Sequence, residues 1–137
     1  MNKIIVRTEV KGDVAKVWKY WNDPEHMTHW QFASLDWECP SVQNDLRKGG
    51  RFKIRMQAKN GSEGFDFEGT YTAVESQKHI AYVMDDTREV MVTFEVIDEN
   101  RVKVTEEFDP ETQNTEELQR TGWQAILDNF KKYVENT

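Results

Sequence analysis

Cysteine, positive charge and long apolar runs are all scarce in this sequence of 137 residues. The single cysteine, Cys39, excludes an internal disulfide framework, and it has no CxxC or Cys/His spacing of the kind that indicates a metal site. No stretch approaches the roughly 20 apolar residues that a helix needs to cross a bilayer. Residues 1–7 hold one apolar triplet followed by charge, which is too short for a signal peptide. We therefore expect a protein of the reducing cytoplasm, without membrane insertion, bound metal or cofactor.

The shortage of positive charge limits which partners the protein can bind. The sequence has 18 Lys and Arg residues and 25 Asp and Glu residues, for a net charge of −7. Nucleic acids require a basic footprint, so we expect no nucleic-acid partner. The acids are densest from Glu106 to Leu118, which holds six acidic residues and no basic one. A solvated loop leading into a helix explains this segment, since carboxylates favour the positive end of the helix dipole. A docking surface for a basic partner is the alternative.

Aromatic side chains, in contrast, are abundant, with five Trp, seven Phe and four Tyr. A chain of this length buries roughly two-thirds of its unfolded surface, so it can form a core without disulfides. We expect residues 1–137 to form one domain. A core alone could be built from Leu and Ile, so the aromatic excess favours walls around a space as well as a packed interior.

Hydrophobic periodicity divides the chain into one strand, two short helices, a run of strands and one long helix. Alternation over residues 4–10 predicts the first strand, and apolar residues at helical spacing up to Trp21 predict a helix capped by Asp13. Asp23-Pro24 begins a second short helix, which we expect to reach about Trp30. Period-two patterns separated by turn residues then predict about six hairpin-connected antiparallel strands. Residues 118–134 are apolar at every third or fourth position, which predicts a long amphipathic helix.

This order of elements predicts an α+β fold in which the C-terminal helix covers one face of a curved antiparallel sheet of about six to seven strands. The residues that alternate toward the covered face would line an apolar cavity with a few polar groups, as small-molecule sites usually do. A core filled by the same side chains is the alternative, and a β-bulge would reverse the assignment of faces. The expected lining residues are Trp30, Phe32, Phe52, Met56, Phe65, Phe67, Tyr71, Tyr82, Met84, Trp123, Leu127 and Phe130.

Six short motifs, taken in order, resemble one known family. They are Val17-Trp18, Asn22-Asp23-Pro24, Trp30, Gly49-Gly50-Arg51-Phe52, Glu68-Gly69-Thr70 and Gly122-Trp123. Together they resemble the branch of the START and birch-pollen-allergen-like (SRPBCC) superfamily that is related to the activator of the heat-shock-protein-90 ATPase. The resemblance covers nearly the whole chain and implies the helix-grip fold.

The sequence departs from that branch in two respects. Its eukaryotic co-chaperones carry an additional N-terminal domain that makes much of the chaperone contact, whereas this sequence opens on the helix-grip pattern. We therefore do not expect the resemblance to carry chaperone activation with it. Gln31-Phe32-Ala33 also replaces the Phe or Gly and Pro that often follow Trp30, so the mouth of a cavity would differ.

A few other residues are candidates for a functional or structural role. Glu106 interrupts the apolar alternation of the last strand and is the one candidate general base, although polarity at a sheet edge explains it equally well. His26 and His29 have the spacing of a metal-binding pair but no third ligand, and with His79 they are interpreted as surface residues. Gly69 suggests a bulge or bend in its strand. Gly122 indicates either a close helix–sheet approach or room for a ligand.

These observations favour non-enzymatic binding of a small hydrophobic molecule, aromatic or lipid-like, between the sheet and the C-terminal helix. The first alternative is a protein-interaction module, a chaperone partner or stress-response accessory, supported by the family resemblance and the acidic segment. The second alternative is an enzyme that acts on a hydrophobic substrate in the same cavity. It would need a buried polar group with a strongly shifted pKa, and the sequence holds none of the common hydrolase, nucleotide-binding or metalloprotease motifs.

Overall fold

The computed structural model describes residues 3–137; residues 1 and 2, part of the stretch in which no signal peptide is expected, lie outside the described residues. Its elements follow the expected order of strand, two short helices, strands and long helix. They are β1 (Ile4–Lys11), α1 (Val14–Asn22), α2 (Pro24–Met27), β2 (Trp37–Asn44), β3 (Arg51–Ala58), β4 (Gly64–Glu75), β5 (His79–Met84), β6 (Glu89–Asp98), β7 (Arg101–Phe108) and α3 (Glu116–Glu135).

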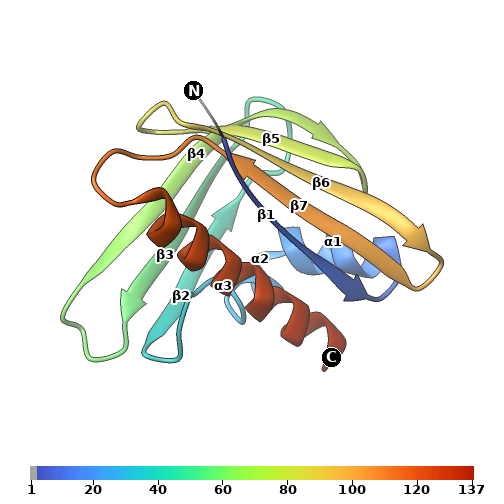
Figure 1. Ribbon diagram of the computed structural model, residues 1–137, viewed down its shortest axis with the longest axis horizontal. Coiled ribbons are helices and arrows are strands. Elements are labelled where there is room, and N and C mark those ends of the chain that lie inside the picture. The colour runs from blue at the N-terminus through green and yellow to red at the C-terminus, as the bar shows by residue number, and fades with distance from the viewer. Residues whose placement is uncertain (1–2) are drawn as a thin grey trace.

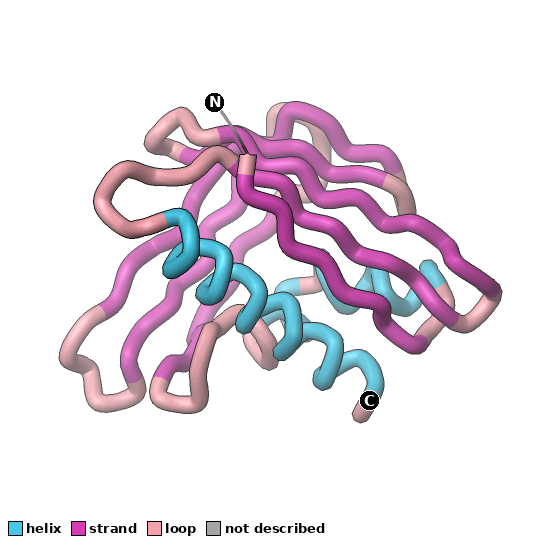
Figure 2. Tube along the Cα trace, viewed as in Figure 1, coloured by secondary structure: helices cyan, strands magenta, loops and turns pink. Residues whose placement is uncertain are grey.

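The strands form one curled antiparallel sheet, and α3 lies across its open side (Figure 1). The order is β1-β7-β6-β5-β4-β3-β2, so each strand from β2 to β6 pairs with the next one along the chain and β1 adds to the far edge beside β7. In Figure 2 the two short helices lie beside one end of the long one. The predicted helix-grip α+β fold is confirmed, with seven strands.

Both short helices begin at the predicted caps. The Asp13 carboxylate accepts a hydrogen bond from the Lys16 amide at 2.8 Å, and Asp23 accepts one from the Glu25 amide at 3.0 Å, with Pro24 at the first helical position. The second helix is shorter than predicted and ends at Met27 instead of about Trp30.

The early end of α2 has a local cause. The backbone amides of His29 and Trp30 bond to carbonyls three residues back, not four, so the chain tightens into a turn. In this turn the Trp30 indole N–H donates to the Tyr20 carbonyl at 3.0 Å and the side chain is fully buried. The turn that ends α2 at Met27 thus also buries the Trp30 indole.

The strands show two more local features. Strand β2 contains Pro40 and lies at a sheet edge, where a residue without an N–H is tolerated, and its register to β3 shifts between Glu38 and Ser41. His79, interpreted from the sequence as a surface residue, is the first residue of β5 and is half-buried. Its amino-acid type gives no strand signal, and pairing with Thr93 of β6 and Glu75 of β4 decides its conformation.

The long helix packs unevenly on the sheet. Its closest partners are β1 and α1, against which its second half buries Leu127, Phe130 and Val134 completely. No comparable close approach to β3, β4 or β5 occurs within residues 3–137. The first half of α3 therefore stands away from that part of the sheet. None of the helices in the described part of the chain is long and apolar enough to cross a membrane.

Candidate functional site

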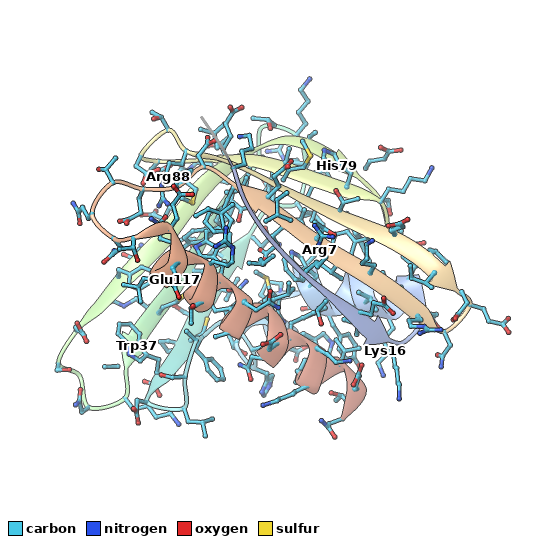
Figure 3. The ribbon with its side chains drawn as sticks, viewed as in Figure 1. Arg7, Lys16, Trp37, His79, Arg88 and Glu117 are labelled. Carbon is cyan, nitrogen blue, oxygen red and sulfur yellow. The ribbon has the colours of Figure 1, made fainter. Side chains whose placement is uncertain are left out.

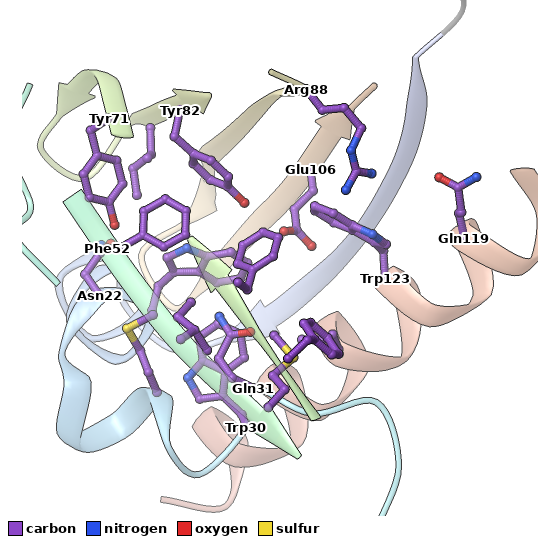
Figure 4. A pocket seen from close by; sticks show the side chains of 18 of the residues that line it. Asn22, Trp30, Gln31, Phe52, Tyr71, Tyr82, Arg88, Glu106, Gln119 and Trp123 are labelled. Atoms are coloured by element: carbon purple, nitrogen blue, oxygen red, sulfur yellow. The ribbon is translucent and has the colours of Figure 1, made fainter. Parts of the chain in front are cut away.

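A cavity of about 290 Å³ occupies the space between the first half of α3 and the inner face of β3, β4 and β5 (Figure 4). Aromatic rings make up much of its wall. Phe52 meets Tyr82 edge-to-face at a centroid distance of 4.8 Å, and Phe67 faces both Tyr82 and Trp123 at 6.1 Å. Such pairs hold rings in fixed relative orientations, so this part of the wall is preformed.

Eight of the twelve residues expected to line the cavity do so. Phe65 forms its rim and is 48% exposed, while Trp30 belongs to the wall but is itself fully buried. Whether any of them contacts a ligand stays a prediction. The eight are Trp30, Phe52, Met56, Phe65, Phe67, Tyr71, Tyr82 and Trp123.

The other four expected residues lie elsewhere. Leu127 and Phe130 are on the inner face of α3 as expected, but in its second half, where the helix closes on β1 and α1 and leaves no space. Met84 is buried at the end of β5, beyond Tyr82. Phe32 follows the turn after α2 and lies in a shallow surface depression beside α3, with Leu35 and Asn129. Alternation identifies a face, but not where along that face two elements separate.

Sequence periodicity missed most of the polar wall. These side chains come from loops, helix ends and the first turns of α3, where no alternating pattern marks which way a residue points. Gln119 is the exception, because a polar residue on the apolar stripe of α3 could have been noticed. The further lining residues are Trp21, Asn22, Met27, Gln31, Ile54, Ile80, Arg88, Glu106, Glu111, Asn114, Gln119 and Ile126.

Glu106 is the most unusual group in the cavity. It lies on β7, between Val6 of β1 and Val92 of β6, so polarity at a sheet edge does not explain it. The residue is only 6% exposed, and no hydrogen bond reaches its carboxyl group from residues 3–137. Burial alone raises the pKa of this carboxyl to about 8. At neutral pH Glu106 is therefore mainly an uncharged carboxylic acid that can donate a hydrogen bond.

Two further polar groups lie at the same end of the cavity. Figure 4 shows the Tyr82 hydroxyl pointing toward Glu106, with the Arg88 guanidinium above Trp123. Burial and the nearby Glu106 carboxyl raise the pKa of Tyr82 well above its usual value. The Arg88 Nε donates to Asp86 at 2.8 Å, which orients the guanidinium. This end therefore offers hydrogen-bond donors inside an otherwise aromatic space.

A chain of hydrogen bonds fixes the opposite end. The Tyr71 hydroxyl donates to the Asn44 side-chain oxygen at 2.6 Å, and the Asn44 amide donates to the Asn22 carbonyl at 2.7 Å. The Asn22 side chain in turn donates to the Trp18 carbonyl at 3.0 Å. These bonds join β4 and edge strand β2 to the end of α1. The polar groups at this end are thus already partnered, unlike Glu106.

Gln119 holds the loop between β7 and α3 at the cavity mouth. Its amide donates to the carbonyls of Glu111 and Asn114 at 3.1 and 2.9 Å, and its oxygen accepts from the Glu111 backbone amide at 2.8 Å. Every hydrogen-bonding atom at the end of this buried side chain is therefore used to position the loop. Its role at the site is to shape the opening.

The two glycines singled out in the sequence differ. Gly69 lies opposite Phe52 in the β3–β4 pairing, and the ring of Phe52 packs against it; the bulge of β4 falls between Tyr71 and Ala73 instead. A Cβ at Gly122 would meet no atom within 4 Å. Close packing against the Phe52 ring and the Val83 carbonyl therefore explains Gly69, whereas close helix–sheet approach does not explain Gly122.

The histidines do not form a metal centre with other ligands. His26 is half-buried, with its ring stacked on Tyr20 at 3.9 Å and its Nδ1 hydrogen-bonded to the Tyr133 hydroxyl at 2.7 Å. His29 is exposed, and its ring stacks on the ring of Tyr133. Among residues 3–137, no three His, Cys, Asp or Glu side chains are grouped so that they could hold a metal ion.

Known structures similar to this chain include two that are more than 40% identical to it. The AHSA1-like protein from Aeromonas hydrophila is 45% identical over 97% of this chain and 93% of its own, with a TM-score of 0.88. A protein from Cytophaga hutchinsonii is 46% identical over 99% and 94% of the two chains, with a TM-score of 0.85. A Chromobacterium violaceum protein at 20% identity, covering 98% and 99%, shares the fold with a TM-score of 0.86.

Sequence families lead to the same assignment. A search among curated proteins found no match. The family model described as "Activator of Hsp90 ATPase homolog 1-like protein" matches residues 11–135, from the end of β1 to the end of α3. The chain therefore belongs to the activator of Hsp90 ATPase homolog 1-like family, in the SRPBCC helix-grip superfamily.

Proposed function

We propose that this protein binds a small hydrophobic molecule, aromatic or lipid-like, in the cavity between α3 and β3–β5, without converting it chemically. The observation that supports this most is the 290 Å³ space itself, which persists although the rest of the interior is densely packed. Ligand sites typically occupy roughly 300–1,000 Å³ and combine apolar walls with a few polar groups. The cavity is at the lower end of that range, which favours a compact ligand.

The construction of the fold supports the same proposal. Leu127, Phe130 and Val134 in the second half of α3 are completely buried, whereas Trp123 in the first half and Ile126 at the middle of the helix face open space. Packed interiors leave few voids larger than a water molecule. A void of this size beside a complete core is therefore better explained by a ligand than by imperfect packing.

Native mass spectrometry of protein purified from its own host tests this proposal. We expect a small additional mass that disappears after mild denaturation and identifies the ligand class. A second measurement covers weakly held ligands: titration with small naphthalene compounds followed by calorimetry. A clean apo mass together with no binding of any such compound at millimolar concentration would reject the proposal.

A second candidate function is a protein-interaction module of the chaperone system. It is supported by the family description and by the exposed acidic residues Glu116 and Glu117 at the start of α3, the latter labelled in Figure 3. The specific test is binding to the middle domain of Hsp90 at micromolar concentration and low salt. No binding under these conditions would remove this candidate, since exposed charges attract most strongly at low ionic strength.

The cytoplasm is the compartment that we propose for either function. Cys39 is a buried free thiol whose pKa is raised by burial to about 11, so it is protonated and unreactive at neutral pH. Fractionation of the host cell, with detection of this chain by antibody, tests the location. Recovery in an extracellular fraction would contradict it.

A further inference from the structure

We propose that the ligand carries a carboxylate, which is held between the Arg88 guanidinium and the carboxylic acid of Glu106. This inference rests on the proposed ligand-binding function and specifies the chemistry of the ligand's polar end. Two groups at one end of the cavity have hydrogen-bonding capacity that is not used up within the described chain.

Glu106 is the first of these groups. Its neighbours across the sheet, Val6 and Val92, offer it no polar partner. Every fully enclosed side-chain nitrogen or oxygen in the described residues has a hydrogen-bond partner, so the unbonded Glu106 oxygens must reach the space of the cavity. A buried polar group without a partner is costly, and a ligand that accepts its hydrogen bond removes that cost.

Arg88 is the second group. Asp86 accepts from both its Nε, at 2.8 Å, and its backbone amide, at 3.1 Å, which fixes the side chain at its base. The guanidinium lines the cavity, and its side chain is only 23% exposed. A guanidinium can engage a second carboxylate through its remaining N–H groups, and it is the side chain best matched to a planar carboxylate.

The surrounding charges favour an anion over a cation. The titratable groups that line the cavity with Glu106 are Tyr82 on β5, Tyr71 at the opposite end on β4, Arg88 in the turn before β6, and Glu111 in the β7–α3 loop. From α3 come the uncharged Gln119 and Trp123. Tyr71 is already bonded to Asn44. With Glu106 protonated, Arg88 is the positive charge that a ligand meets at this end, and it would repel an ammonium group. The Glu111 carboxylate belongs to the loop at the cavity mouth, where it accepts a hydrogen bond from the Asn114 backbone amide at 2.6 Å.

The protonation state of Glu106 should make the affinity for a charged ligand depend on pH. Burial raises the pKa of Glu106 to about 8, so the acid form can donate to a ligand carboxylate at neutral pH. Above that pH, Glu106 itself becomes a carboxylate and repels the ligand's charge. Affinity for an anionic ligand should therefore fall as the pH rises through about 8, whereas affinity for a cation should rise.

Three naphthalene probes of similar size separate the possibilities by calorimetry: 2-naphthoate, the neutral 2-acetylnaphthalene and the cationic 2-naphthylmethylamine. At about pH 6.5 we expect naphthoate to bind most tightly of the three. Between about pH 6.5 and 9.5 its dissociation constant should increase on the order of tenfold. Tighter binding of the ketone or the amine than of naphthoate at the lower pH would overturn this inference and leave the proposed function intact. Failure of all three to bind would count against both.

Two variants and one control test whether Glu106 causes the pH dependence and whether Arg88 holds the ligand carboxylate. Glu106→Gln should remove the pH dependence, and Arg88→Met should weaken naphthoate on the order of tenfold while changing the ketone little. Glu107→Gln, on the adjacent residue and not part of the cavity wall, is the control and should retain the wild-type profile. Thermal melts check that each variant folds. An unchanged pH profile in folded Glu106→Gln, or unchanged naphthoate affinity in folded Arg88→Met, would contradict the proposal.

Discussion

The ring of Phe52 on β3 lies directly over Gly69 on β4, its partner in the strand pairing. A Cβ added at Gly69 would come within 2.8 Å of Phe52 Cζ and 2.7 Å of the Val83 carbonyl oxygen. The absent side chain of Gly69 therefore lets the Phe52 ring reach Tyr71 and Tyr82 in the cavity wall, at 5.3 and 4.8 Å between ring centroids. This contact decides how the aromatic wall is arranged.

Alanine substitutions at the two glycines should have opposite signs. Gly69→Ala would collide with a backbone carbonyl, so we expect a loss of roughly 1–3 kcal/mol or more in the free energy of unfolding. Gly122→Ala places its methyl group in open space within α3, so we expect a gain of about 0.5–1 kcal/mol from helix propensity. Urea unfolding of both variants measures this. A stabilising Gly69→Ala would show that the ring does not occupy this position.

Trp123 should matter more to the cavity than to stability. Its indole stacks on the fully buried Phe108 at a centroid distance of 3.8 Å, but its other side faces the cavity. Trp123→Ala should therefore cost roughly 2 kcal/mol, less than the ~3–5 kcal/mol of a fully packed aromatic residue, and should weaken binding of the naphthalene probes. Leu127→Ala, one turn further on and fully buried, is the comparison. We expect it to cost about 3 kcal/mol with less effect on binding, and the reverse order would contradict this assignment.

The hydrogen bond between Tyr71 and Asn44 should contribute measurably to stability. Tyr71→Phe removes the donor and leaves the Asn44 oxygen without its 2.6 Å partner, so we expect a loss of about 1–2 kcal/mol. Asn44→Ala also removes the bond to the Asn22 carbonyl and should cost more. A double-mutant cycle measures the coupling between the two residues. Additive losses would mean that the bond contributes nothing in solution.

Glu106 should make the protein less stable as the pH rises. Its pKa is raised to about 8 in the folded state, whereas the unfolded value is near the usual 4.5. Between these values the unfolded chain loses the proton first, so the free energy of unfolding falls progressively from about pH 4.5 to pH 8, by roughly 4 kcal/mol in total. Below this range both states are protonated, and the contribution of Glu106 vanishes.

The difference between wild type and Glu106→Gln isolates this effect, because other titrating groups contribute to both proteins. We expect the variant to be the more stable of the two at pH 8, with an advantage that shrinks toward pH 4.5. Chemical unfolding at several pH values measures it. A difference that stays constant with pH would show that Glu106 is not buried without a partner.

The sequence by itself determined the order of elements and the helix-grip architecture. Helical spacing, the caps at Asp13 and Asp23 and the alternating strands are local patterns, and each depends on residues only a few positions apart. Most of the aromatic wall followed from the same alternation, because period two assigns residues such as Phe52 and Tyr82 to one face of the sheet. Family resemblance then agreed with these patterns over nearly the whole chain.

Only the tertiary structure decided where the cavity lies and what its polar end contains. The second half of α3 closes on β1 and α1 and the first half does not, so Leu127 is core while Trp123 faces a space, although both lie on one apolar stripe. Arg88 and Glu106 line the same end of the cavity because a turn and a central strand converge there. They are 18 positions apart in the sequence, and no local pattern predicts this placement. The burial that raises the pKa of Glu106 depends on the whole sheet and helix around it, since desolvation is a property of the assembled interior and not of the chain.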